Sequence, residues 1–472
     1  MLTGHDGTIW LAIMTPEPPT PRKSLSKVAV AIAAAVALLT ASVLVSAQAE
    51  PKPAPQPDLT AALADPPGEL PTPFEKSNGA AWTTHPQSLR FYRSLDAASD
   101  RVRVDNIGRT GQGRPIQLVS VGAPAPRTAA EAADGSVAMF VCSVHGDEPS
   151  GREACMQLAR NLALSTEAAV TRFLERTTVL FVNANPDGWV ADTRGNADGT
   201  DINRDYLAAG TPEATAVLKT IRDWKPDVLN DLHEYTPREH YVTDLLHLWP
   251  RNRNVDPGIY ELSRTMSEDY AAAQVTSLGY TAGVYGRLVK DGEPYRQVAG
   301  DGQARILRNY AGLVNVVGML SETANEALNP EEEAVPAQLN RRRVTVNLNS
   351  ALGTIQLVQE NRDRLAAETA AAAERQAEAG AEQSGVIYFA GQDDMLPTAA
   401  DQVEPHPMCG YRLTDEQYAE LRPTLDLHGI RTTRDDAGRL VPLAQPARGL
   451  IPLLLDARHE HAVAEAEPVA DC

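Results

Sequence analysis

The 472-residue chain is poor in basic residues, with 43 Lys and Arg against 62 Asp and Glu and a net charge of −19. Proteins that bind nucleic acid neutralise phosphates with clustered Lys and Arg, so this balance argues against a nucleic-acid partner. The sequence also contains no internal repeat. Its hydrophobic content of 43% and charged content of 22% are ordinary for a globular protein. The length leaves room for one large domain and a smaller one.

Cysteine is scarce, and the four residues allow three pairings among which the sequence does not choose. Cys142 falls in an apolar strand and Cys155 on a helix, where we expect buried thiols. Cys409 and Cys472 form the more interesting pair, because a bond between them would hold the C-terminus.

One long apolar run, Val28 to Val45, follows the basic residues Arg22, Lys23 and Lys27. The small-residue sequence Ala47-Gln48-Ala49 comes next, so we predict a signal peptide over residues 1–49 that is cleaved after Ala49. A retained membrane anchor is the alternative, because the run is long enough to span a bilayer. We expect a secreted or periplasmic protein without membrane attachment unless the leader is retained. Residues 50–71 are rich in Pro and Ala and indicate a solvated linker.

From residue 72 on, apolar strands alternate with helical patterns. A pair of strands is expected over 101–121. Four further strands are expected over 137–144, 177–182, 227–232 and 313–320, and two helices over 151–162 and 212–224. This order predicts an α/β fold with a mixed, largely parallel sheet and helices on both faces.

The last part of the chain differs in composition. Residues 336–382 predict a long helix that docks first and then projects, closing the larger domain over 72–384. Residues 385–472 then predict a small C-terminal α/β unit with no catalytic constellation. The unit includes a helix that begins at the capping box Thr414–Gln417 and ends at Pro423.

Polar residues stand directly after the four expected strands: His145, Asn185, His233 and Glu322. In open α/β sheets, ligands bind beyond the carboxyl ends of the strands. Two His and one Glu are a standard ligand set for catalytic zinc, and His145, Glu148 and His233 supply one. An HxxE string alone is weak support, and the remaining histidines are expected to be structural or exposed, with His240 and His247 in a surface loop.

The motifs occur in a specific order: His145-Gly-Asp-Glu148, Asn185-Pro-Asp-Gly188, Arg194, Gly199-Thr-Asp-Ile-Asn-Arg204, His233 and Ser321-Glu322. Over residues 72–325 this order resembles the zinc carboxypeptidase family. The resemblance implies one Zn²⁺ per chain, held by His145, Glu148 and His233. It also implies a peptide substrate, or a peptidoglycan peptide.

The resemblance also implies a role for each remaining motif residue. Asp201 matches a carboxylate that fixes the ring of the first zinc histidine. Arg194 matches the residue that stabilises the oxyanion of the scissile carbonyl. Asn203 and Arg204 match the pair that grips a C-terminal carboxylate. Glu322 matches the general base that activates water at the zinc. The family also uses a Tyr from a mobile loop, for which four residues are candidates: Tyr280, Tyr285, Tyr295 and Tyr310.

The sequence departs from the family at Asp147, where the digestive members carry Arg. HGDE is closer to bacterial members that cut cell-wall peptides and to related deacylases. We therefore expect a zinc-dependent metallocarboxypeptidase, with two alternatives. One is a peptidoglycan stem-peptide amidase or small-molecule deacylase using the same site, and the other is an inactive cell-wall binding module. No long pro-segment precedes the domain, so activation by its removal is not expected.

Overall fold

The structure is a computed structural model that describes residues 59–64, 68–132, 134–238, 241–286, 301–391, 398–435 and 438–472, with the backbone of 288–290 and 293–295. The expected signal peptide and its cleavage site at Ala49 lie outside this range. Residues Pro57–Cys472 form one compact unit. Among the described helices, none is both long and apolar enough to cross a membrane.

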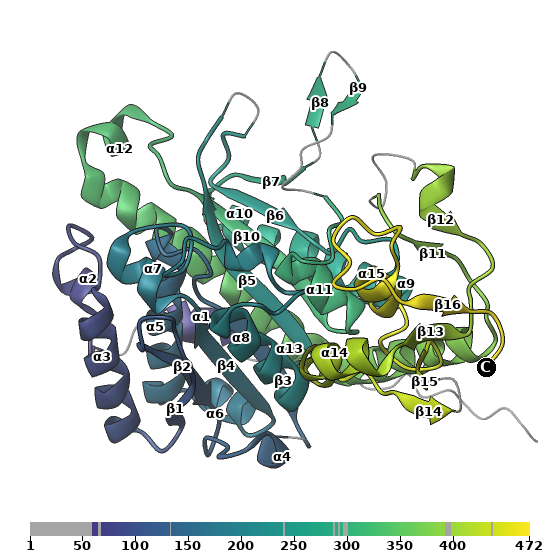
Figure 1. The fold of residues 1–472 in the computed structure, drawn as a ribbon. Helices are drawn as coiled ribbons and strands as arrows, with labels where there is room; N and C mark the ends of the chain where they lie inside the picture. Colours follow the sequence, from purple (N-terminus) through teal and green to yellow (C-terminus); the bar gives the residue numbers. More distant parts are fainter. Residues whose placement is uncertain are drawn as a thin grey trace, which may run out of the picture. The chain divides into compact units, whose positions relative to one another are not determined.

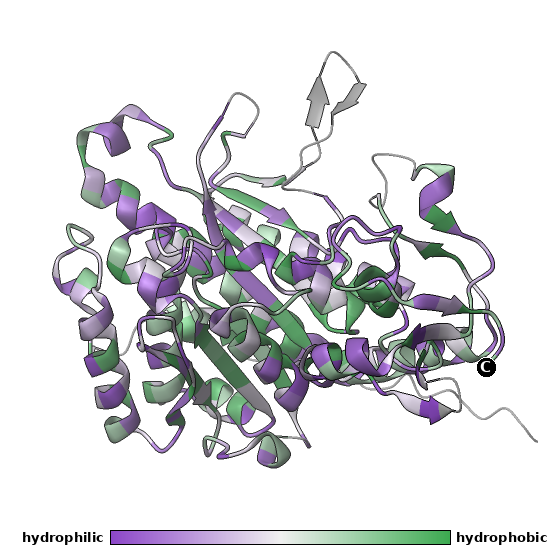
Figure 2. Cartoon of the chain, viewed as in Figure 1, coloured by the Kyte–Doolittle hydropathy of each residue, from purple (hydrophilic) through white to green (hydrophobic). Residues whose placement is uncertain are grey.

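An eight-stranded sheet organises the chain, in the order β1-β2-β4-β3-β5-β10-β6-β7 (Figure 1). Its strands are β1 Val102–Arg109, β2 Pro115–Val121, β3 Ser136–Val141, β4 Thr177–Asn183, β5 Val228–Tyr235, β6 Leu245–Leu248, β7 Ala282–Val284 and β10 Val317–Ala324. The neighbours β4, β3, β5 and β10 run parallel, whereas β1, β2 and β6 pair antiparallel. The predicted mixed, largely parallel α/β sheet is confirmed. Strands β3 and β4 are mainly hydrophobic, whereas β5 includes a hydrophilic stretch (Figure 2).

Helices cover both faces of this sheet, as predicted. The main ones are α3 His85–Ala98, α5 Pro149–Leu164, α7 Pro186–Ala191, α8 Pro212–Trp224, α9 Pro257–Thr265, α11 Leu307–Leu313 and α13 Pro336–Ala381. Side chains alternate in direction along β5, so its two faces can be followed residue by residue. Asn230 of β5 donates to Thr354 of α13. Asp231 instead lies near Asn203, which accepts a hydrogen bond from the first residue of α11. The helices α13 and α11 therefore lie on opposite faces.

Strands β5 and β10 extend further than the sequence pattern indicated. His233 and Glu322 lie inside these strands and not after them, so that part of the prediction is wrong. The two strands pair over eight residues in parallel register, with Glu322 beside His233. Polar residues ended the apolar run in the sequence, but the backbone ladder continues through them.

Two expectations about the chain ends of the catalytic domain are also wrong. Residues Leu59–Ala64, placed in a solvated linker, form helix α1 and bury Leu59 and Leu63 in the core. The long helix α13 does not project after its first half. It departs from helical geometry at Asn361 and packs to its end, where a Cβ on Gly380 would lie 2.0 Å from the Leu443 carbonyl oxygen.

The C-terminal residues contain the strand pair β11 Ile387–Tyr388 and β12 Val403–Glu404, and an antiparallel sheet in the order β14-β15-β13-β16. The four strands of that sheet are β13 Gly410–Leu413, β14 Thr433–Asp435, β15 Gly438–Pro442 and β16 Glu467–Val469. Helix α14, Asp415–Leu427, begins at the predicted capping box, but Pro423 lies inside the helix and does not end it.

Disulfide bonds join all four cysteines in two pairs. Cys409 bonds to Cys472 and so holds the C-terminus. Cys142 and Cys155 are buried but bonded to each other, so the expectation of free thiols is wrong. Spacing alone did not reveal that the end of β3 and the second turn of α5 face one another.

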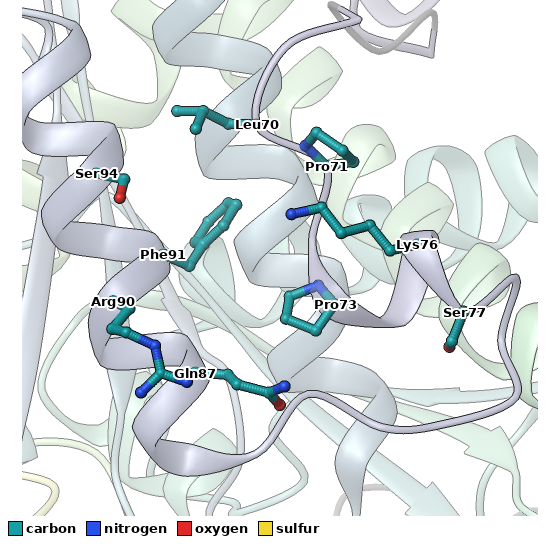
Figure 3. A pocket seen from close by; sticks show the side chains of 9 residues that line it. All are labelled: Leu70, Pro71, Pro73, Lys76, Ser77, Gln87, Arg90, Phe91 and Ser94. Carbon is teal, nitrogen blue, oxygen red and sulfur yellow. The ribbon is translucent and has the colours of Figure 1, made fainter.

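A cavity of about 550 Å³ lies between residues 70–77 and α3. Phe91 lines it from the side of α3, opposite Pro71 and Pro73 (Figure 3). Its polar lining consists of Lys76, Ser77, Gln87, Arg90 and Ser94, and no predicted site residue lines it.

Candidate metal centre

Three side chains from separate segments converge on one point. His145 lies in the loop after β3, Glu148 immediately before α5, and His233 within β5. The Nδ1 atoms of the two histidines are 3.0 Å apart. Glu148 places Oε1 2.6 Å from His145 Nδ1 and Oε2 2.8 Å from His233 Nδ1. All three side chains are buried, and together they form a group that could hold a metal ion.

The loop that carries His145 is fixed by the Asn185-Pro-Asp-Gly188 turn. A Cβ on Gly146 would lie 1.9 Å from the Gly188 carbonyl carbon, so only glycine permits this contact. The amide of Asn185 donates to the carbonyl oxygens of Val144 at 3.0 Å and Gly195 at 3.1 Å. The turn therefore positions the first ligand loop.

Carboxylates on the far side of each imidazole ring orient the donors. His145 Nε2 lies 3.1 Å from Asp201 Oδ1, and His233 Nε2 lies 2.8 Å from Asp231 Oδ2. A carboxylate accepts a hydrogen bond from the protonated ring nitrogen that it faces, so the proton stays on Nε2 and Nδ1 of each ring is free to bind a metal. A donor set of two imidazole nitrogens and one carboxylate suits zinc, so the residues present fit this ion.

The charges in this group are strongly coupled. Burial alone would raise the pKa of Glu148, but the charges of His145 and His233 outweigh it and hold the pKa well below its ordinary value. Burial opposes protonation of His233, yet Asp231 and Glu148 raise its pKa well above its ordinary value. Removing Glu148 or Asp231 would therefore change the pKa values of the ionisable groups around it.

Glu322 and Arg194 flank the three donors. Glu322 is partly exposed and stands beside His233 in the sheet. Burial of its carboxyl group and the charge of Glu148 raise the pKa of Glu322 to about 7, against the opposing effect of His233. Arg194 is 49% exposed and places Nη1 3.2 Å from His145 Nδ1. Asp201 accepts from Arg194 Nε at 3.1 Å and so orients the guanidinium.

Asn203 and Arg204 differ in their surroundings. The Asn203 side chain is 4% exposed, and its Oδ1 accepts from the backbone N–H of Leu307 at 2.9 Å. Its Nδ2 lies 3.4 Å from Asp231 Oδ2. Arg204 is half-buried and donates to the Asn203 carbonyl oxygen at 2.8 Å. Arg204 is therefore the more accessible of the two.

Of the three candidate tyrosines whose side chains the structure describes, Tyr285 is the one whose pKa responds to the charge of Glu322. Burial raises its pKa, and the charge of Glu322 adds to the shift. Tyr310 instead lies 2.9 Å from His428 Nδ1, and Tyr280 packs against the cluster of Leu245 and Val275. The Tyr295 side chain lies outside the described residues.

The sequence reasoning missed two carboxylates on either side of His233. Asp231 lies two residues earlier on the same face of β5, and the period of a strand could have identified it. Glu234 lies on the opposite face, where it accepts from Ser150 N at 2.7 Å and pairs with Arg343. The backbone N–H of Glu234 also donates to Glu148 Oε2 at 3.1 Å. Both residues therefore support the ligands.

We expected two further histidines, His240 and His247, to lie in a surface loop. His247 is buried in β6, and its Nδ1 lies 2.8 Å from Ser267 Oγ, so that prediction is wrong. His240 lies outside the described residues.

A cavity of about 700 Å³ lies beside the ligand loop and is lined by Asp147, the exposed residue of the HGDE motif. Two tryptophans, Trp82 and Trp189, contribute to its wall. Arginine side chains stack on both rings, Arg343 on Trp82 and Arg152 on Trp189.

Residues 89–223 match the sequence model of the zinc carboxypeptidase family. The matched segment contains His145, Glu148, Arg194 and Arg204. The structure places His233 and Glu322, which follow the matched segment, beside these residues.

Three individual proteins illustrate what this chain is similar to. The chain is similar to carboxypeptidase 2 of Trichophyton rubrum, with 29% identity over 192 residues that cover 38% of this chain and 35% of that protein. The chain therefore spans about a third of that relative's length. Murein peptide amidase A of Escherichia coli is 29% identical over 186 residues, which cover 36% of this chain and 73% of that protein. A solved metallo-carboxypeptidase from Burkholderia cenocepacia aligns with 59% of this chain and 69% of its own chain, at 18% identity and a TM-score of 0.45.

Proposed function

We propose that this protein is a zinc-dependent metallocarboxypeptidase that hydrolyses C-terminal peptide bonds. The observation that carries the proposal is the convergence of His145 Nδ1, His233 Nδ1 and the Glu148 carboxylate, with Glu322 in register beside His233. The name carboxypeptidase 2 of the fungal relative agrees with it.

Bound between these donors, zinc would polarise the scissile carbonyl and lower the pKa of water. Glu322 accepts the proton of the attacking water on its carboxylate and returns it to the leaving amine. Burial raises the pKa of Glu322 above its ordinary value, which helps the carboxylate to take up this proton and return it. The Arg194 guanidinium, oriented by Asp201, donates to the carbonyl oxygen as negative charge develops there.

Arg204 supplies the contact for the substrate's terminal carboxylate. Its guanidinium is partly exposed, and among the described residues no carboxylate forms an ion pair with it. A planar guanidinium can bind both oxygens of a carboxylate. The resemblance assigns Asn203 to the same task, but its Nδ2 already lies 3.4 Å from Asp231 Oδ2 and 3.0 Å from His233 Nε2. The buried contacts of Asn203 indicate that it also positions Arg204 and the start of α11.

The test compares peptides that differ only in a free or amidated C-terminus. If Arg204 binds the terminal carboxylate, amidation should lower kcat/KM about a hundredfold, the equivalent of a charge-assisted contact. The Arg204→Ala variant should lose about as much on free peptides and little more on amidated ones. Equal rates on both peptides would contradict an exopeptidase.

A second candidate is an amidase that acts on peptidoglycan peptides, favoured by the similarity to murein peptide amidase A. Such an enzyme would use the same metal site and the same carboxylate contact. Purified peptidoglycan peptides and linear peptides with free C-termini should be compared at equal concentration. Hydrolysis of the peptidoglycan peptides but not of the linear peptides would favour the amidase. A deacylase of small acylated amines would be insensitive to amidation.

We also propose that the protein is exported and that its mature chain begins at Glu50, on the basis of the basic, apolar and Ala-x-Ala order in residues 22–49. N-terminal sequencing of the exported protein tests this. A mature form that still contains Val28–Val45 would indicate a membrane anchor.

A further inference from the structure

Two arginines, Arg305 and Arg308, lie next to the proposed carboxylate contact. The backbone N–H of Tyr206 donates to the Arg305 carbonyl oxygen at 3.3 Å, and that of Leu307 donates to Asn203 Oδ1 at 2.9 Å. These two bonds hold residues 305–307 against the segment that carries Arg204. The charge of Arg204 in turn lowers the pKa of both Arg305 and Arg308, although burial contributes more.

Neither arginine has a carboxylate partner among the residues that the structure describes. Arg305 Nε donates to Gln303 Oε1 at 2.7 Å, and Arg308 Nη2 donates to the Asp301 carbonyl oxygen at 2.6 Å. The Asp301 carboxylate itself accepts from Gln303, at 3.0 Å from the backbone nitrogen and 2.7 Å from the side chain.

Arg308 is 1% exposed, and its Nε has no hydrogen-bond partner in the described part of the chain. Burial, together with the charges of Arg251 and Arg204, lowers its pKa to about 10, with Asp301 acting in the opposite direction. A buried cation without an ion pair costs free energy. Three guanidinium groups thus concentrate positive charge on one side of the site, in a protein whose net charge is −19.

The C-terminal residues complete the surroundings of Arg305. Burial and the charge of Arg305 lower the pKa of His461, and burial lowers that of His459 to about 4, so both rings are neutral at pH 7. Among residues 459–461, Glu460 carries the one negative charge, and its side chain is 87% exposed. An exposed carboxylate in water screens a half-buried guanidinium only weakly.

We propose that Arg305, with Arg308 behind it, binds a carboxylate in the side chain of the residue that the enzyme releases. Arg204 would bind the terminal carboxylate of the same residue, so the substrates would be peptides that end in glutamate or aspartate. This inference rests on the proposed carboxypeptidase function and names its substrate class.

The test uses the zinc-loaded full chain and four peptides of one sequence that end in Glu, Gln, Lys or Phe. The pair Glu and Gln has nearly the same shape and differs in charge, so it isolates the proposed contact. A bidentate charge-assisted contact should give the Glu peptide a kcat/KM about 10- to 100-fold above that of the Gln peptide. Lys should be the poorest substrate, because its charge repels the arginines.

Variants of Arg305 locate the contact. Arg305→Gln should remove the preference for Glu over Gln and leave the rate on the Gln peptide nearly unchanged. Arg305→Lys should keep part of the preference, because it retains the charge but not the planar fork. The matched control is Arg434→Gln on the exposed strand β14, which should keep the full preference.

The outcomes separate this inference from the proposed function. Hydrolysis of all four peptides at similar rates, or an undiminished preference in Arg305→Gln, would overturn the inference alone. If no peptide is hydrolysed, the proposed function fails, and binding decides the inference. Calorimetry with the Glu322→Gln variant should then show the dipeptide Gly-Glu binding at least tenfold more tightly than Gly-Gln, and equal affinity would overturn it.

Discussion

Replacing Asp231 with Asn should weaken zinc binding while leaving the fold intact. Asp231 is fully buried in β5, and its Oδ2 lies 2.8 Å from His233 Nε2. Asparagine has nearly the same shape, and its amide oxygen can still accept from the ring. What it removes is the negative charge that makes His233 a stronger donor and fixes the proton on Nε2.

The size of the effect follows from the contact. Losing a partner that orients a metal-bound histidine typically costs 10- to 100-fold in metal affinity. This corresponds to about 1.4–2.7 kcal/mol, and saturating zinc should stabilise the variant less than the parent protein by the same amount. The melting temperature in excess zinc should therefore fall by a few degrees relative to the parent, whereas the difference between the metal-free proteins should be smaller.

Competition with a chelator of known affinity measures zinc binding without reference to activity. The matched control is Asp227→Asn, because Asp227 immediately precedes the same strand and accepts from Val137 N at 2.8 Å, far along the strand from His233. The control should bind zinc as the parent does. Equal affinity in all three proteins would show that Asp231 does not act on the ring. Equal weakening in both variants would mean that the strand and not the contact is responsible.

Four further expectations concern separate parts of the molecule. Glu322→Gln should keep its zinc, as metal analysis can show, and lose about a hundred- to ten-thousandfold in kcat, because the amide cannot accept the proton. Since burial raises the pKa of Glu322 to about 7 and bound zinc would lower it, kcat/KM should fall as the pH drops through a midpoint between about 4.5 and 7; a flat profile would contradict the assignment. Leu63→Ala should reduce the free energy of unfolding in urea by about 2–5 kcal/mol, which a truly solvated linker residue would not do. Replacing Cys142 and Cys155 by Ala together should cost roughly 3 kcal/mol for a bond that closes 13 residues, and an unchanged urea midpoint would mean that the bond does not form.

The sequence was sufficient to predict the sheet and three side chains that converge on one point, and both predictions share a physical reason. Parallel strands buried on both faces are apolar runs, and the first polar residues near their ends must converge at one edge. His145 and Glu148 follow this rule. The same rule misplaced the ends of β5 and β10, because it treats the first polar side chain as the end of the strand. Backbone pairing is indifferent to side-chain polarity and continues through His233 and Glu322.

Features that depend on contacts distant in sequence were not accessible in this way. Helix α1 is six residues long and follows a Pro-rich stretch, and only its burial against the core explains why Leu59 and Leu63 are apolar. The packing of the end of α13 depends on Leu443, which is 63 residues beyond Gly380. Local periodicity contains no information about either partner.

Strand β5 shows why the departures from an apolar pattern were the informative ones. A strand in the middle of a sheet covered on both sides should be continuously apolar, yet four of its residues are buried and polar: Asn230, Asp231, His233 and Glu234. Each of these four polar side chains has a hydrogen-bond or ion-pair partner inside the protein. Asn230 bonds to Ser321 and Thr354, Asp231 faces His233, and Glu234 joins Ser150 and Arg343. Burying these groups costs free energy that an apolar strand would not lose. Buried polar groups that are retained at this cost are expected at functional sites, which agrees with the proposal that His233 and its supports form part of a metal site.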